Sequence, residues 1–135
     1  MERGHAPAGG GVELTKGNIM RVILFEPRFA ELVKSGKKHQ TIRKSARCRA
    51  GDVLSLRRWS GLPYRSKQVI LKQVTCSKVV GVTVDWRGVT FEGSNIRIAD
   101  EEVLAHADGF QSFIEMADWF AKTHSLPFSG EIIYW

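Results

Sequence analysis

Short apolar runs separated by polar turns predict a mixture of strands and a few helices. The run at residues 21–25 has the length of a strand. A helix is expected to begin at Pro27, because proline suits the first turn of a helix. It is expected to end at Gly36, since glycine readily adopts the left-handed cap conformation. The first predicted unit is therefore a strand followed by a helix.

Most of the elements after this helix are predicted to be strands. A turn at Gly51 and Asp52 and a loop at residues 60–63 contain the usual strand-breaking residues. Residues 68–85 are rich in Val, Ile and Thr and predict one long bent strand or two strands. The other predicted strands are 39–43, 53–59, 88–91, 95–98 and 131–135.

Two further helices are predicted near the end of the chain. Asp100 is a suitable N-cap for a short helix through Ala107. Ser112 and Glu115 form a capping box before an apolar stripe at helical spacing. We expect the stripe to lie in the core together with three tryptophans, Trp86, Trp119 and Trp135.

These elements predict an α+β protein built on a small β-barrel with a few short peripheral helices. The 135 residues correspond to a single domain, which we expect to cover residues 18–135. Residues 1–17 are glycine-rich and lack periodicity, which predicts a flexible extension.

The net charge of +6 favours a polyanionic partner such as RNA or DNA, although it is also compatible with a merely solubilising surface. The positive charge is concentrated in the first half of the chain. Between residues 34 and 72, Asp52 is the only acidic residue among many lysines and arginines. No apolar run is long enough for a membrane helix, and the start has no apolar stretch of the kind a signal peptide carries. We therefore expect a cytoplasmic protein without a membrane partner.

The two cysteines, Cys48 and Cys76, lack the spacing of a metal site or a CxxC motif. We interpret them as ordinary buried or half-buried thiols. The sequence thus predicts no metal and no cofactor, and we expect a monomer.

The most informative stretch is residues 36–43, Gly-Lys-Lys-His-Gln-Thr-Ile-Arg. On a strand, His39, Thr41 and Arg43 would point to one face, and Gln40 and Ile42 to the other. Lys38 stands at the junction of helix and strand, so alternation does not define its direction. An imidazole, a hydroxyl and a guanidinium are thus expected along one side of the strand.

This stretch resembles the signature of the ASCH family, G-x-K-x-x-T-x-R after a short first helix. Further segments fit the same pattern, and the resemblance extends over about residues 20–135. Those segments are Gly51-Asp52-Val53-Leu54, Trp59-Ser60-Gly61-Leu62-Pro63-Tyr64, Ala107-Asp108-Gly109-Phe110, Trp119-Phe120 and Leu126-Pro127-Phe128-x-Gly130.

The resemblance implies a PUA-like β-barrel, a fold whose members bind RNA. One ASCH branch resembles this chain and hydrolyses the amide of N4-acetylcytidine with a lysine, a threonine and an acidic residue. Lys38 and Thr41 match the first two, and Asp108 stands where that branch has a glutamate. Other ASCH members bind or cleave RNA.

The chemistry of these residue types agrees with such a role. A threonine hydroxyl attacks a carbonyl only when a base takes its proton. A lysine can act as that base when burial or nearby cations lower its pKa toward neutrality. Arg43 could hold the oxyanion, and Asp108 could position water. The alternatives are a solvated surface lysine at Lys38, a plain strand residue at Thr41 and a turn residue at Asp108.

An RNA-binding surface is the second prediction from this region. Trp59 and Tyr64 flank a Gly-Pro loop next to Arg57 and Arg58. Aromatic rings among arginines are typical of base stacking on single-stranded RNA or a nucleoside. The alternative for Trp59 is that it ends a strand inside the core.

The sequence therefore leaves three functions open. The first is binding of RNA or a modified nucleoside through a basic pocket that includes Arg43 and His39. The second is hydrolysis of an N4-acetylcytidine-like amide at the same pocket. A ribonuclease is the weakest, because no clear pair of histidines or carboxylates is present for acid–base cleavage.

Overall fold

The computed structural model of this chain describes residues 17–92 and 101–135. Three predictions lie wholly or mostly outside these residues: the N-terminal extension, the strand at 95–98 with its turn, and the N-cap at Asp100.

The described residues form two compact units, and neither unit is one continuous stretch of sequence. Unit 1 contains residues 17–38, 47–78 and 135. Unit 2 contains residues 39–46 and the described part of 79–134. The predicted site is affected directly, because the motif at residues 36–43 is divided between the two units.

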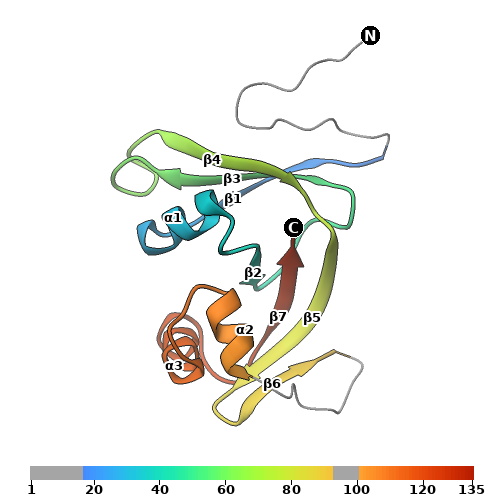
Figure 1. Ribbon diagram of the computed structural model, residues 1–135, viewed down its shortest axis with the longest axis vertical. Coiled ribbons are helices and arrows are strands. Elements are labelled where there is room, and N and C mark those ends of the chain that lie inside the picture. Colours follow the sequence, from blue (N-terminus) through green and yellow to red (C-terminus); the bar gives the residue numbers. More distant parts are fainter. Residues whose placement is uncertain (1–16, 93–100) are drawn as a thin grey trace. The chain divides into compact units, whose positions relative to one another are not determined.

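A three-stranded sheet forms the body of unit 1. Its strands are β1 (Met20–Leu24), β3 (Val53–Trp59) and β4 (Gln68–Thr75), in the order β1-β3-β4. Strand β3 pairs with β1 in parallel and with β4 in antiparallel fashion. Helix α1 (Pro27–Ser35) packs against β3 and β4. Figure 1 shows the β3–β4 hairpin loop and the start of α1 at the same end of this sheet.

Helix α1 begins and ends where its sequence predicts. Pro27 occupies the first turn, and the left-handed Gly36, with φ of 85°, donates its backbone N–H to Val33. Phe29 and Val33 form its buried face. Glu26 stands at the N-cap position without making a side-chain capping hydrogen bond.

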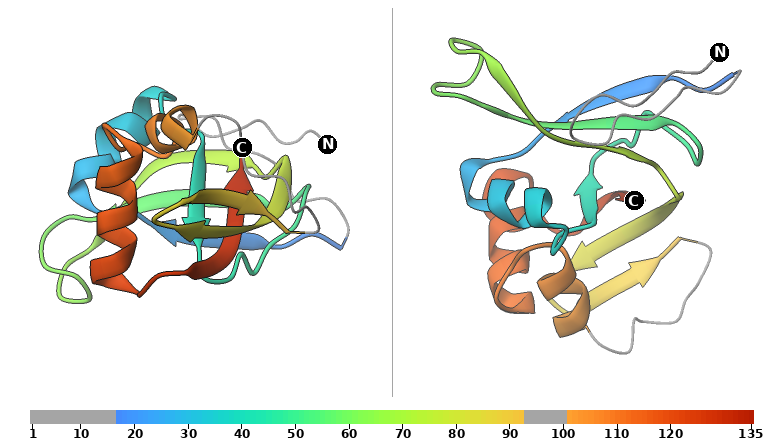
Figure 2. Two further views of the ribbon diagram at one scale, coloured as in Figure 1. Left: turned by 90° about the horizontal axis from the view of Figure 1, so that it is seen from below. Right: turned by 45° about the horizontal axis from the view of Figure 1, so that its top comes forward.

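Unit 2 combines a four-stranded sheet with two helices. The sheet has the order β2-β7-β5-β6, with strands β2 (Gln40–Arg43), β7 (Phe128–Tyr134), β5 (Lys78–Asp85) and β6 (Gly88–Phe91). Helices α2 (Glu101–Ala107) and α3 (Phe113–Thr123) lie side by side (Figure 2). The predicted stretch at 68–85 is thus two strands, β4 and β5.

The predicted capping box at the start of α3 is confirmed in its main contact. The hydroxyl of Ser112 accepts a hydrogen bond of 3.1 Å from the backbone N–H of Glu115. The Glu115 carboxylate in turn accepts 2.7 Å from the N–H of Gln111, one residue earlier than the usual partner. Two N–H groups near the helix start are satisfied in this way.

Each unit has its own apolar interior. In unit 1 it includes Ile23, Phe29, Val33, Leu54 and Leu56, and in unit 2 it includes Val84, Val89, Met116, Phe120, Ile132 and Ile133. The predicted core position is wrong for Trp86, which is 51% exposed, while Trp119 and Trp135 are half-buried. Trp86 stands in the turn between β5 and β6, where a side chain faces solvent.

The α+β class is confirmed, but the barrel is not. Within the described ranges the strands form two open sheets and no closed barrel. No helix within those ranges is long and apolar enough to cross a membrane.

Candidate functional site

Lys38 is the last residue of the first stretch of unit 1, directly after the loop that ends α1. Only 2% of it is exposed, and its backbone N–H donates 2.9 Å to the carbonyl oxygen of Leu32. Its ammonium lies 5.1 Å from the ring centre of Phe29 and 5.9 Å from that of Phe25. Such distances allow cation–π attraction. The alternative of a solvated surface lysine is therefore wrong.

An aromatic pocket opens at the hairpin end of unit 1. The rings of Trp59 and Tyr64 lie 5.1 Å apart with planes tilted by 49°. They bound a cavity of about 290 Å³ between the β3–β4 loop and the start of α1. We call this cavity the aromatic pocket, and its lining residues are Leu24, Phe25, Glu26, Pro27, Trp59, Gly61, Pro63 and Tyr64.

The two aromatic rings differ in exposure, and neither lies in the core. Trp59 is half-buried at the end of β3, whereas Tyr64 is 86% exposed. Tyr64 adopts a left-handed backbone with φ of 63°, which is uncommon for a residue other than glycine. The alternative of a core position for Trp59 does not fit its half-buried side chain and its place on the pocket wall.

Arg57 and Arg58 are held along the strand that leads to the pocket. The Nε of Arg57 donates 2.8 Å to Ser55 Oγ, and a terminal nitrogen donates 2.9 Å to Gln68. Arg58 donates 3.1 Å to the backbone carbonyl of Trp59. Both side chains are half-buried, so part of each guanidinium is ordered before any ligand binds.

Thr41 and Arg43 share one face of strand β2 in unit 2. The Arg43 Nε donates a hydrogen bond of 3.0 Å to Thr41 Oγ1. Thr41 is 4% exposed, and its neighbour in register on β7 is Ile133. The hydroxyl is thus fixed by a cation on its own strand. His39 precedes β2 and is exposed, so the predicted row of three side chains is reduced to two.

Asp108 lies in the turn after α2, as predicted, and is 4% exposed. Its carboxylate accepts a 3.4 Å hydrogen bond from Gln40 Nε2, across 68 positions of sequence. Burial raises the pKa of Tyr134, and the negative charge of Asp108 raises it further. Gln40 and Tyr134 are paired in register on β2 and β7. The buried Gln40 and Asp108 and the half-buried Tyr134 therefore form a polar group within unit 2.

Alternation along β2 puts the Gln40–Asp108 pair and the Thr41–Arg43 pair on opposite faces of the strand. Gln40 and Thr41 are neighbours on the strand, so their side chains leave it on opposite faces. Asp108 is joined to the Gln40 face, and Arg43 to the Thr41 face. Gln40 is not among the predicted site residues. The signal that could have found it is a polar residue on the same predicted face as the core residue Ile42.

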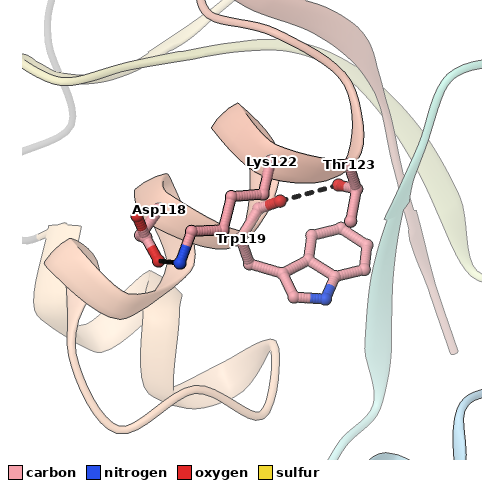
Figure 3. Close-up of polar contacts among 4 residues, drawn as sticks. All are labelled: Asp118, Trp119, Lys122 and Thr123. Carbon is pink, nitrogen blue, oxygen red and sulfur yellow. Dashed lines mark hydrogen bonds and ion pairs between the residues drawn. The ribbon is translucent and has the colours of Figure 1, made fainter.

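The turn that carries Asp108 is fixed by the two helices around it. Glu102 of α2 accepts 3.0 Å from the backbone N–H of Phe113 at the start of α3. Phe110, two residues after Asp108, packs with Trp119 at 5.9 Å. Figure 3 shows the part of α3 that contains Trp119. There Asp118 forms an ion pair with Lys122, and the Thr123 hydroxyl donates a hydrogen bond to the backbone carbonyl of Trp119. The position of Asp108 therefore depends on α2–α3 packing.

The cysteines are free thiols in unit 1. Burial raises the pKa of Cys48 to about 12 and also raises that of Cys76, so both are protonated at neutral pH. In the described part of the chain, no group of three or more His, Cys, Asp or Glu side chains could hold a metal ion.

No family model, curated protein or solved structure matches this chain.

Proposed function

We propose that this protein binds single-stranded RNA or a modified nucleoside, and that a base stacks in the aromatic pocket. The Trp59–Tyr64 pair carries the proposal. A large ring that is 86% exposed beside a half-buried tryptophan gives up favourable burial when no ligand is present. Bases stack on such rings regardless of sequence, because every base has a π-face.

The charge near the pocket supports an anionic ligand. Arg57 and Arg58 are ordered on β3, the strand that ends at Trp59. Arg65 and Lys67 are exposed in the loop that comes next. Arginine and lysine at these positions would contact phosphates on either side of the stacked base. At the level of fold, the proposal includes the PUA-like architecture that the ASCH resemblance implies.

Fluorescence anisotropy with a labelled single-stranded RNA of eight nucleotides tests binding. We expect binding at low salt and clear weakening in the Tyr64→Ala variant. Leu62→Ala is the matched control, because Leu62 is an exposed apolar residue of the same loop and is not among the pocket residues. Equal affinity for Tyr64→Ala and Leu62→Ala would place the binding surface elsewhere.

A second candidate function is hydrolysis of an acylated amino group on a nucleoside. Its supporting observation is the burial of Lys38 and Thr41, which match the motif, and of Asp108, which stands where that ASCH branch has a glutamate. Buried polar and charged side chains are common in active sites. We propose Thr41, whose hydroxyl accepts the hydrogen bond from Arg43, as the nucleophile.

Chromatography of N4-acetylcytidine incubated with the purified protein tests this second function. Release of cytidine and acetate above the uncatalysed background would support it. The two functions are separable, since a protein that binds the nucleoside without turnover is a reader of modified RNA.

A further inference from the structure

We infer that Glu26 makes the aromatic pocket selective for bases that carry an exocyclic amino group. The inference rests on the proposed function, because it assumes that a base enters this pocket. It adds that Glu26 contacts the edge of the base that carries the exocyclic group.

Glu26 is the one charged residue among the eight that line the pocket in the described structure. The remaining lining is aromatic, aliphatic, proline or glycine, apart from the Tyr64 hydroxyl. Glu26 is also exposed, so its carboxylate is accessible to a ligand. Its side chain makes no capping hydrogen bond to α1.

The local sequence explains why the carboxylate is available. Glu26 has an extended backbone, with φ of −64° and ψ of 152°, directly before Pro27. Its carbonyl oxygen accepts a hydrogen bond of 2.9 Å from the backbone N–H of Phe29. The backbone of Glu26 therefore takes part in the first turn of α1, whereas its side chain makes no capping hydrogen bond. Phe25 on its other side is buried and forms part of the pocket wall.

An ionised carboxylate can only accept hydrogen bonds. The amino group of cytosine or adenine donates to it, and a glutamate paired with the cytosine amino group is a known mode of base recognition. The oxo group of uracil or hypoxanthine is an acceptor and would face the carboxylate with like polarity. Stacking on Trp59 and Tyr64 is nearly indifferent to this change. Discrimination therefore depends on the carboxylate.

The pocket size agrees with a single base. A volume of about 290 Å³ is just below the range of small-molecule sites, which run from roughly 300 to 1,000 Å³. One ring with its sugar is thus the natural occupant, and flanking nucleotides would lie outside the pocket.

Matched tetranucleotides test the inference. The tetranucleotides of cytidine (C4) and uridine (U4) differ in the amino or oxo group at ring position 4 and in the accompanying change at N3. The tetranucleotides of adenosine (A4) and inosine (I4) form a second pair that differs in an amino or oxo group. We expect the parent to bind C4 at least about fivefold more tightly than U4, and A4 more tightly than I4 by a similar factor. Glu26→Gln should bring both ratios close to one, because an amide both donates and accepts.

Thermal unfolding of Glu26→Gln is measured in parallel, since an acid at this position can also stabilise α1. Unequal ratios in the parent that collapse in a folded Glu26→Gln variant support the inference. Equal binding of C4 and U4 by the parent, or unchanged ratios in Glu26→Gln, would overturn it and leave the proposed function standing. If the parent binds no tetranucleotide at low salt, the proposed function itself fails.

Discussion

The guanidinium of Arg43 donates a hydrogen bond from Nε to the hydroxyl oxygen of Thr41, its neighbour two residues before on β2. The contact occupies one lone pair of the hydroxyl and leaves its proton free to be given to a base. A positive charge at this oxygen also stabilises the alkoxide that develops as the proton leaves. The pair is therefore arranged to make Thr41 more acidic than an isolated threonine.

The first prediction concerns Thr41 in the proposed hydrolysis of N4-acetylcytidine. Thr41→Val keeps the shape of the buried side chain and removes the hydroxyl, so turnover should fall to background. Thr41→Ser keeps the hydroxyl and should retain part of the activity. Initial rates by chromatography measure both. Thr90→Val, on strand β6, is the matched control and should be as active as the parent. Undiminished turnover in Thr41→Val would rule out Thr41 as the nucleophile.

The second prediction concerns stacking on Trp59. Trp59→Ala should weaken binding of a single-stranded RNA by about 1–3 kcal/mol, or roughly 5- to 150-fold, because a base loses its aromatic partner. Trp86→Ala is the control, since Trp86 is a tryptophan that is 51% exposed and lies outside the pocket. Anisotropy titrations of both variants against the parent give the comparison. A similar loss for both tryptophans would contradict a specific stacking site.

The third prediction concerns the salt dependence of RNA binding. Arg58→Gln removes one phosphate contact, so affinity should fall for all RNA sequences. The slope of log K against log salt should flatten by about 0.7, the value for one phosphate on a single strand. Lys122→Gln makes the same change in charge on α3 and should leave the slope unaltered. A slope that is identical in the parent and Arg58→Gln would remove Arg58 from the interface.

Local signals in the sequence predict the local structure well. Pro27 and Gly36 bound α1, β3 occupies the predicted range of residues 53–59, and Ser112 caps α3. Each depends on the backbone preferences of a few adjacent residues, which a single sequence contains.

Relationships across the chain are harder to predict. The parallel pairing of β1 with β3, and the hydrogen bond of Gln40 to Asp108, join residues more than 30 positions apart. They depend on tertiary packing, which short-range periodicity does not encode. The exposure of Trp86 is hard to predict for the same reason. Its sequence neighbours resemble a buried strand, and only the position of the β5–β6 turn shows that Trp86 lies outside the strands. The motif at 36–43 predicts the burial of Ile42, but neither the burial of Lys38, Gln40 and Thr41 nor the division of the motif between two units.

The fourth prediction concerns acid stability and Asp52. Its buried carboxylate accepts hydrogen bonds from the backbone of Ile19 and Arg49 and from the side chain of Asn18, at 2.8–2.9 Å. These contacts lower the pKa of Asp52, with the Ile19 amide as the largest cause. The ionised form is thus favoured in the folded protein. The stabilisation is present above the unfolded-state pKa and is lost as the pH falls through the folded-state value.

Asp52→Asn should therefore lower the melting temperature at pH 7 and reduce the acid sensitivity of the protein. Thermal unfolding of parent and variant between pH 7 and pH 3 measures this. We expect the two curves of melting temperature against pH to converge at low pH. Asp85→Asn is a suitable control, because Asp85 bonds only the adjacent Trp86 amide among the contacts described. A constant difference across the pH range would contradict the assigned role of the carboxylate.

The last prediction concerns Gly130 on β7, which packs against the end of β2. A Cβ atom at this position would collide with the carbonyl oxygen of Arg43 and come within 3.0 Å of the Phe128 ring. Backbone cannot yield as a flexible side chain can, so Gly130→Ala should destabilise the protein by about 1–3 kcal/mol. Denaturant titration gives the change in unfolding free energy. Gly61→Ala is the control, since its nearest atoms, in Ser66, lie at an ordinary 3.5 Å.

The collision also acts on the segment that carries Arg43. A folded Gly130→Ala protein should therefore lose the proposed turnover of N4-acetylcytidine while it keeps its affinity for single-stranded RNA at the aromatic pocket. Equal stability of the two alanine variants would show that β7 can move away from β2 without cost.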